Sequence, residues 1–163
     1  MKTAFPSIED INLVYLQTKD WCNRHYPELT YRIMEIPEGA VDPIHDEIRQ
    51  EDKRWKNIEI RGHVIPAEQM FPLTPFGIEE LRDLVIQISV PNLIEVGLAT
   101  QDKESGEITL LAKTGDRFYY SHGVEYEILL YKIGAVFGNT DIPTFYFASA
   151  EKVRMDSTIF QDL

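Results

Sequence analysis

The sequence has few of the features that mark a secreted, membrane-spanning or disulfide-rich protein. Cys22 is the one cysteine among 163 residues, which excludes an internal disulfide and predicts a buried thiol in a reducing compartment. No uncharged apolar run reaches the roughly 18 residues of a membrane helix, and the first residues lack the apolar segment of a signal peptide. We therefore expect a soluble protein made in the cytoplasm, with no membrane partner.

Basic residues are also scarce, since 16 Lys and Arg against 27 Asp and Glu give a formal net charge of −11. The densest basic stretch, residues 49–56, is itself interrupted by acidic residues. A groove that binds nucleic-acid phosphates tightly needs clustered Lys and Arg. This charge balance argues against tight nucleic-acid binding, but it is compatible with a weakly repulsive surface past which DNA slides.

One amphipathic helix is clearly predicted near the N-terminus. Ser7 and Asp10 form a capping-box pattern, and apolar residues then recur at three- and four-residue spacing as far as Cys22. Because Pro27 disfavours helical geometry in the residue before it, the helix is expected to end near His25.

Strand-like alternation accounts for most of the remaining sequence. It is found at residues 29–36, 58–61, 64–65, 84–90, 108–111, 117–120, 125–131 and 144–153. A short helix is expected at 91–96, with Pro91 in its first turn and Gly97 after it. The pattern predicts one domain over 1–163, with a helical segment at 1–27 and a β core made of 29–36 and 58–154. Its fold class is mainly β, a small antiparallel β-barrel or sandwich of about six strands.

Two long segments, residues 37–57 and 67–80, show neither helical nor strand periodicity and are predicted to be extended arms. Such arms become ordered on a neighbouring subunit, or they cover the open end of their own barrel. The first arm contains Trp and Arg, which are enriched as interface anchors. The candidate subunit-interface residues are Asp42, Pro43, His45, Arg54 and Trp55 on the first arm, and Phe71, Pro75 and Phe76 on the second.

The stretch GDRFYYSHGVEYEI, residues 115–128, gathers four side chains capable of chemistry. They are Asp116, His122, Glu125 and Glu127. On a strand the two glutamates share a face about 7 Å apart, which is a separation suited to paired catalytic carboxylates. The same alternation is typical of a half-solvated strand, with Tyr126, Ile128 and Leu130 on the opposite face. We interpret the stretch as a β-hairpin, with the aspartate and histidine at turns and the glutamates on the solvated face.

Other signatures of catalysis or cofactor binding are missing from the sequence. No serine lies in a GxSxG elbow, and the glycines of residues 134–138 do not have phosphate-loop spacing. His45, Asp46 and Glu47 form the only tight cluster of histidine and carboxylates, and His122 is a further candidate metal ligand. We predict a protein with no enzymatic activity, cofactor or metal, and we retain a small metal-dependent β-barrel enzyme as an alternative.

Five segments follow one another in an informative order along the chain. They are DPIHDE (42–47), IPA (65–67), GDRF (115–118), VEYEI (124–128) and FGNTDIP (137–143). In this order they resemble the neck proteins, also called head-closure or head-to-tail joining proteins, of long-tailed bacteriophages. The resemblance extends from about residue 41 to residue 154, and it implies a virion structural protein rather than a catalyst.

The resemblance also implies an assembly. Stopper-type neck proteins form a homo-oligomeric ring, a hexamer or dodecamer, between the portal or adaptor ring and the tail terminator or tail. The ring closes the filled head, docks the tail and lets genomic DNA pass through its channel without sequence-specific binding. Ring subunits contact each other head to tail. A tail-terminator or adaptor subunit of the same connector is an alternative, although adaptors are mostly helical, and a cytosolic binding module is another.

Overall fold

The computed structural model describes residues 7–35, 54–66, 83–120, 123–134 and 142–153, which form two helices and nine strands. In chain order these are α1 (Ile8–His25), β1 (Glu28–Glu35), β2 (Arg54–Arg61), β3 (His63–Pro66), β4 (Leu84–Ser89), α2 (Val90–Glu95), β5 (Ala99–Gln101), β6 (Ile108–Leu110), β7 (Arg117–Tyr120), β8 (Val124–Gly134) and β9 (Phe145–Lys152). The mainly β fold with an N-terminal helix and one short helix confirms the fold class expected from the sequence.

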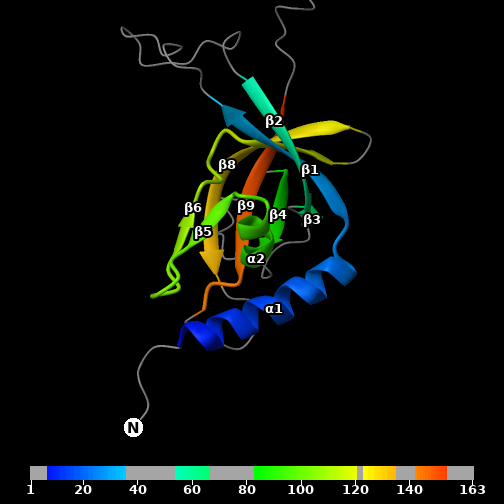
Figure 1. Ribbon diagram of the computed structural model, residues 1–163. Helices are drawn as coiled ribbons and strands as arrows, with labels where there is room; N and C mark the ends of the chain where they lie inside the picture. Colours follow the sequence, from blue (N-terminus) through cyan, green and yellow to red (C-terminus); the bar gives the residue numbers. More distant parts are fainter. Residues whose placement is uncertain (1–6, 36–53, 67–82, 121–122, 135–141, 154–163) are drawn as a thin grey trace, which may run out of the picture.

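Seven strands form one antiparallel sheet in the order β2-β1-β7-β8-β9-β4-β3, and β5 pairs with β6 in a separate hairpin. The two edge strands β2 and β3 are consecutive in the chain and are separated only by Gly62. The sheet therefore curls until its edges approach each other. Because β2 and β3 do not pair with each other, the sheet is not a closed barrel, and its halves face each other as in a sandwich (Figure 1).

Gly62 lies at this corner in close packing with its neighbours. A Cβ atom at position 62 would lie 3.0 Å from Cδ1 of Leu29 and 3.2 Å from Cγ1 of Ile88. The N–H of Gly62 donates to the carbonyl oxygen of Pro27 (3.0 Å), which fixes the corner against the start of β1. A larger residue would press against the Leu29 and Ile88 side chains, which would have to give way by a few tenths of an ångström.

The main hydrophobic core fills the inside of the curled sheet. Its largest fully buried side chains include Tyr31, Ile86, Phe118, Ile128 and Tyr146, from five different strands. The α2 helix and the segment after it close one end of this core with buried leucines at positions 93 and 98. Burial of this much apolar surface is the main stabilising contribution to such a fold.

The α1 helix packs on the outer side of the sheet (Figure 1). Its capping box is formed, since the Asp10 amide donates to Oγ of Ser7 (3.2 Å) and the Ser7 amide donates to Oδ2 of Asp10 (3.3 Å). Cys22 packs against Val85 of β4 in a second apolar cluster. The predicted helix, its end at His25 and the buried thiol are therefore confirmed. Because α1 covers its outer side, β4 is buried on both faces.

Strand β8 contains a β-bulge that corrects one expectation. Ile128 pairs with Ala150, but Ser149 pairs with Leu130, so Leu129 is an extra residue. Ile128 lies in the main core, whereas Leu130 packs against the second cluster below α1. The prediction that these two side chains share a face is wrong, because one inserted residue reverses the alternation of a strand.

The prediction of a first extended arm over residues 37–57 is wrong at the C-terminal end of that range. Residues 54–57 form the first half of β2, where Arg54 pairs with Glu35 and Trp55 with Met34. The second predicted arm, 67–80, lies outside the described residues, as does 37–53 of the first. The short strand β5 was not predicted from the sequence.

Candidate functional site

The candidate interface residues divide into two described and six undescribed ones. Arg54 and Trp55 lie in β2. Asp42, Pro43, His45, Phe71, Pro75 and Phe76 lie outside the described residues, and so do the candidate metal ligands His45, Asp46, Glu47 and His122.

Trp55 contacts two arginines of its own sheet. The guanidinium carbon of Arg32 lies 4.9 Å from the centroid of the Trp55 ring, and that of Arg117 lies 4.7 Å from it. Arg32 and Arg117 are direct cross-strand partners on β1 and β7, so they bring their side chains to the same place. Arg32 also lies over the ring of Tyr119, at 5.3 Å. Cation–π contacts of this kind stabilise the sheet, and they give Trp55 a role within the subunit that the sequence did not predict.

The two glutamates of β8 join this arginine–aromatic cluster. An Nη1 nitrogen of Arg32 lies 2.6 Å from Oε1 of Glu125, and Arg117 lies 3.6 Å from the same oxygen. Arg117 also lies 4.0 Å from Oε1 of Glu127. The glutamates share a face, as predicted, but that face is only partly solvated, because the Glu125 side chain is 20% exposed. Glu125 is thus held by a charge-assisted hydrogen bond from Arg32, and Glu127 lies at the outer limit of an ion pair with Arg117, so the carboxylates help to link β8 to β1 and β7.

Asp116 is fully buried, which the sequence did not indicate. Its carboxylate accepts hydrogen bonds from the Tyr31 hydroxyl (2.8 Å), the Met34 amide (3.0 Å) and the Lys113 amide (3.0 Å). The ammonium group of Lys113 lies 4.0 Å from Oδ1 and donates to the carbonyl oxygen of Met34 (2.7 Å). Burial raises the pKa of Tyr31 well above its usual range, and the nearby Tyr146 and Asp116 raise it further. The buried carboxylate is therefore satisfied within the fold and holds the turn before β7 against β1.

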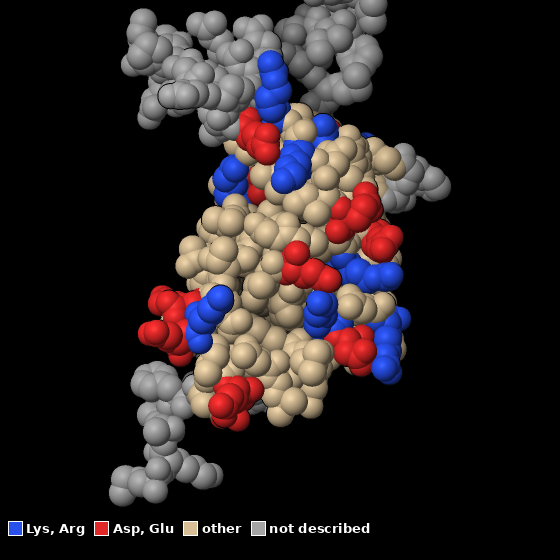
Figure 2. Space-filling model, in the orientation of Figure 1, with Lys and Arg blue, Asp and Glu red and all other residues tan. Residues whose placement is uncertain are grey.

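The outward side of α1 carries exposed apolar residues. Leu13 is 55% exposed and Leu16 is 66% exposed, although both lie on the most regular helix of the protein. They face away from Ile11, Tyr15 and Cys22, which form the buried side of the helix. In Figure 2 the surface at this end of the molecule is uncharged in its middle, with charged side chains on either side. An apolar patch of this kind on a helix is suited to contact with another protein.

Charge on the face shown in Figure 2 is mixed, with basic and acidic side chains close to one another and uncharged surface between them. No group of three or more His, Cys, Asp or Glu side chains in the described ranges is arranged to hold a metal ion. No helix within those ranges is both long enough and apolar enough to cross a membrane. Comparisons with protein-family models, with curated proteins and with solved structures find no match to this chain.

Proposed function

We propose that this protein is a structural subunit of the neck of a tailed bacteriophage, of the stopper or head-closure type. In the virion it forms a homo-oligomeric ring, a hexamer or dodecamer, between the portal or adaptor ring and the tail. The ring closes the filled head, provides the docking surface for the tail and lets DNA pass without sequence-specific binding. The net charge of −11 suits a channel wall to which DNA does not adhere.

The observation that carries this proposal is the ordered set of five sequence segments, and the fold gives a physical reason for two of them. Segments 115–118 and 124–128 come together, because the Gly115 amide donates to the carbonyl oxygen of Ile128 (2.9 Å) and the Ile128 amide donates to that of Asp116 (2.9 Å). They form the turn and hairpin that carry the buried carboxylate. A shared order of such segments is expected when the framework of a fold is shared.

The mainly β fold and the exposed residues of α1 also support this proposal, although less specifically than the five segments do. A mainly β subunit fits a stopper or a tail terminator better than it fits an adaptor, since adaptors are mostly helical. The exposed Leu13 and Leu16 of α1 give a ring subunit an apolar surface for its neighbour. The tail-terminator role is the second candidate, because it shares the mainly β architecture and the ring.

Sedimentation of the purified protein tests the ring, and cryo-electron microscopy of purified virions tests the location. We expect oligomers whose population falls in the double variant Leu13→Glu, Leu16→Glu, because burying a carboxylate in an apolar contact is costly. The matched control is Leu111→Glu, which changes a leucine that is 52% exposed at a distant place in the sequence, before β7. A strictly monomeric protein that is absent from purified virions would contradict the proposal.

A further inference from the structure

A shallow groove of about 340 Å³ lies between α1 on one side and α2 and β5 on the other, and it is open to solvent. In Figure 1, α2 lies directly above the middle of α1. The groove is lined by Asn12, Tyr15, Leu16 and Lys19 of α1, by Pro91, Ile94 and Glu95 of α2, and by Gln101 of β5. Its accessible lining is mainly apolar, although it lies at the surface of the protein.

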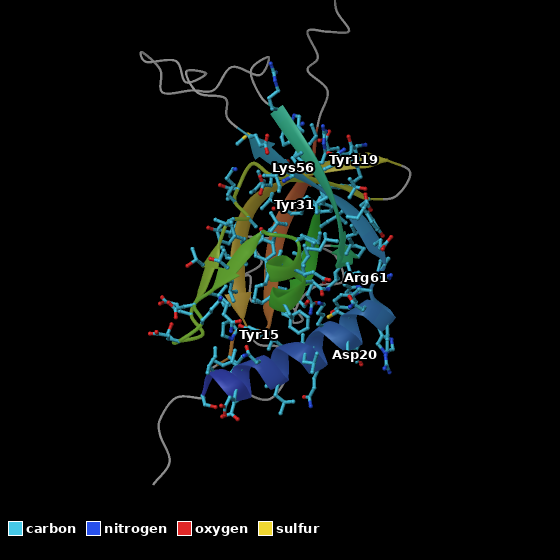
Figure 3. The ribbon with its side chains drawn as sticks, viewed as in Figure 1. Tyr15, Asp20, Tyr31, Lys56, Arg61 and Tyr119 are labelled. Atoms are coloured by element: carbon cyan, nitrogen blue, oxygen red, sulfur yellow. The ribbon has the colours of Figure 1, made fainter. Side chains whose placement is uncertain are left out.

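The apolar side chains of the groove can be reached from outside. Leu16, which is 66% exposed, lines the α1 side, and the half-buried Ile94 lines the α2 side. Tyr15 and Pro91 lie deeper. Figure 3 shows Tyr15 on the side of α1 that faces the sheet, where its hydroxyl donates to the carbonyl oxygen of Pro143 (2.9 Å). The groove thus extends the exposed apolar surface of α1 inward toward α2.

Two polar contacts mark the ends of the groove. The ammonium nitrogen of Lys19 lies 3.1 Å from Oε2 of Glu95, and Nε2 of Gln101 donates to Oδ1 of Asn12 (3.4 Å). Asn12 and Lys19 are about two helical turns apart, so the groove between the contacts is about 10 Å long, which matches about three residues of extended chain. Because the charges at its rim are already paired with each other, the occupant that fits best is apolar and uncharged.

The chain itself contains a segment of this chemistry. Among the residues that the structure does not describe, the longest run without a charged side chain is 69–78, QMFPLTPFGI. The run contains two phenylalanines, Phe71 and Phe76, and prolines at positions 72 and 75. Proline restricts the backbone before binding, so less conformational entropy is lost when such a segment binds in a groove.

The points of attachment of this segment favour binding to another subunit. Pro66 of β3 and Leu84 of β4 are direct cross-strand partners, and an ordinary hairpin joins such strands with about two to five residues, far fewer than 67–83. The segment leaves at the start of β4, whereas Pro91 and Ile94 of the groove follow its end. Since β4 is buried on both faces and paired on both edges, the segment has no path along it within its own subunit. A segment at one end and a groove at the other are the two different surfaces that a head-to-tail contact requires.

We propose that the groove between α1 and α2 binds residues 69–78 of a second copy of this chain, with a phenylalanine of that segment against Leu16 and Ile94. The inference rests on the ring of the proposed function and names the segment that makes its subunit contact. The contact buries exposed apolar surface on both partners, which is the main favourable contribution to such an interface.

The first experiment measures binding of the segment by itself. A fluorescent peptide of residues 67–80 is titrated into the full-length variant Phe71→Glu, Phe76→Glu, whose own segments no longer fill the groove because burying a carboxylate in an apolar contact is costly. We expect saturable binding by fluorescence anisotropy, and Leu16→Glu, added to this variant, should weaken it about tenfold. The matched control Leu111→Glu changes a leucine that is 52% exposed at a distant place in the sequence, and it should leave the affinity unchanged.

The second experiment identifies the chain that supplies the segment. Leu16→Cys and Phe76→Cys are made in separate full-length proteins, which are mixed and oxidised, and Phe71→Cys is tested in the same way. Cys22 is kept in all of them, because it is fully buried. We expect a disulfide between different chains, since it forms where two α-carbons come within about 7 Å of each other. Much less should form when Leu111→Cys replaces Leu16→Cys.

Saturable binding that Leu16→Glu weakens, together with a disulfide between chains, supports the proposal. The proposal is overturned by lack of saturable binding, by equal effects of Leu16→Glu and Leu111→Glu, by lack of a disulfide at both phenylalanine positions, or by a disulfide that forms only within one chain carrying both cysteines. Rings in purified virions that form without the disulfide would count against this contact alone. Peptide binding and the disulfide in a protein that is absent from virions would count against the proposed function alone.

Discussion

The Tyr31 hydroxyl donates a 2.8 Å hydrogen bond to Oδ2 of Asp116, although 85 residues separate the two in sequence. Both side chains are fully buried. Tyr31 belongs to β1, and Asp116 belongs to the turn that precedes β7, so the contact joins the first strand of the chain to the hairpin of β7 and β8. The stretch that looks most like a reactive site in the sequence is therefore part of the framework of the fold.

The first prediction concerns this buried carboxylate. Asp116→Ala removes the acceptor of three hydrogen bonds and leaves their donors unpaired in the interior. We expect the free energy of unfolding to fall by about 3–5 kcal/mol, as for removal of one partner from a buried charged network. Tyr31→Phe removes only one of these bonds and should cost about 1–2 kcal/mol. Urea unfolding measures both, and equal losses in the two variants would show that the amide donors contribute nothing.

The second prediction concerns alkaline pH. Burial raises the pKa of the Cys22 thiol from 9.0 to about 11, partly offset by a hydrogen bond with Ser89, and burial raises the pKa of Tyr15 from 10.0 to about 12. The folded state therefore binds these protons more tightly than the unfolded state does. The resulting stabilisation is fully present below the unfolded values and is lost as pH rises through the folded ones.

Stability should accordingly fall between pH 9.0 and about 11 through Cys22, and between pH 10.0 and about 12 through Tyr15. Urea unfolding at a series of alkaline pH values measures this decline, and Cys22→Ala should flatten its lower part. A thiol-specific reagent provides a second check, since it should react with Cys22 only as the protein unfolds. Stability that is constant across the whole window would contradict the assignment of these groups as buried and neutral.

Local signals were sufficient to predict the helices. The capping box at Ser7 and the regular apolar spacing after it predicted α1. Ser89 caps α2, Pro91 lies in its first turn, and Gly97 adopts a positive φ of 84° just after it. Each of these devices acts within a few residues, so a single sequence is enough to reveal it.

The first half of β2 could not be predicted because its residues look like a loop. Within Arg54–Arg61 only Ile60 is buried, so the strand has little of the apolar alternation that identifies a sheet. It is held instead by its pairing with β1 and by the stacking of Trp55 against arginines from other strands. The burial of Asp116 was missed because two of the residues that bond to it, Tyr31 and Met34, are distant in sequence.

The third prediction separates the two roles proposed for Trp55. Trp55→Ala removes the ring that both Arg32 and Arg117 contact, so we expect the free energy of unfolding of the monomer to fall by about 1–2 kcal/mol. The free energy of unfolding of Trp55→Phe should lie between that of Trp55→Ala and that of the wild type. Leu16→Ala, at a position that is 66% exposed, should change the free energy of unfolding by no more than about 0.5 kcal/mol. If Trp55→Ala instead lowers assembly and leaves the monomer as stable as before, the interface role expected from the sequence is the correct one.

The fourth prediction uses the bulge in β8. Leu129 is the extra residue between two regular stretches of pairing, and it is 38% exposed. Its deletion joins Ile128, which faces the main core, directly to Leu130, which faces α1, so the alternation of an unbulged strand is restored without turning any buried side chain around. We expect the deletion to cost less than about 2 kcal/mol, since only the local twist of the bulge is lost.

Deletion of Ile86 is the matched control, because β4 pairs regularly with β3 and β9 and is buried on both faces. Losing one residue there moves every later side chain of the strand to the wrong side, so the protein should fail to fold. Circular dichroism and urea unfolding distinguish the two variants. If the Leu129 deletion is as damaging as the Ile86 deletion, the bulge itself is needed to curl the sheet, because bulges increase the local twist of the strand that contains them.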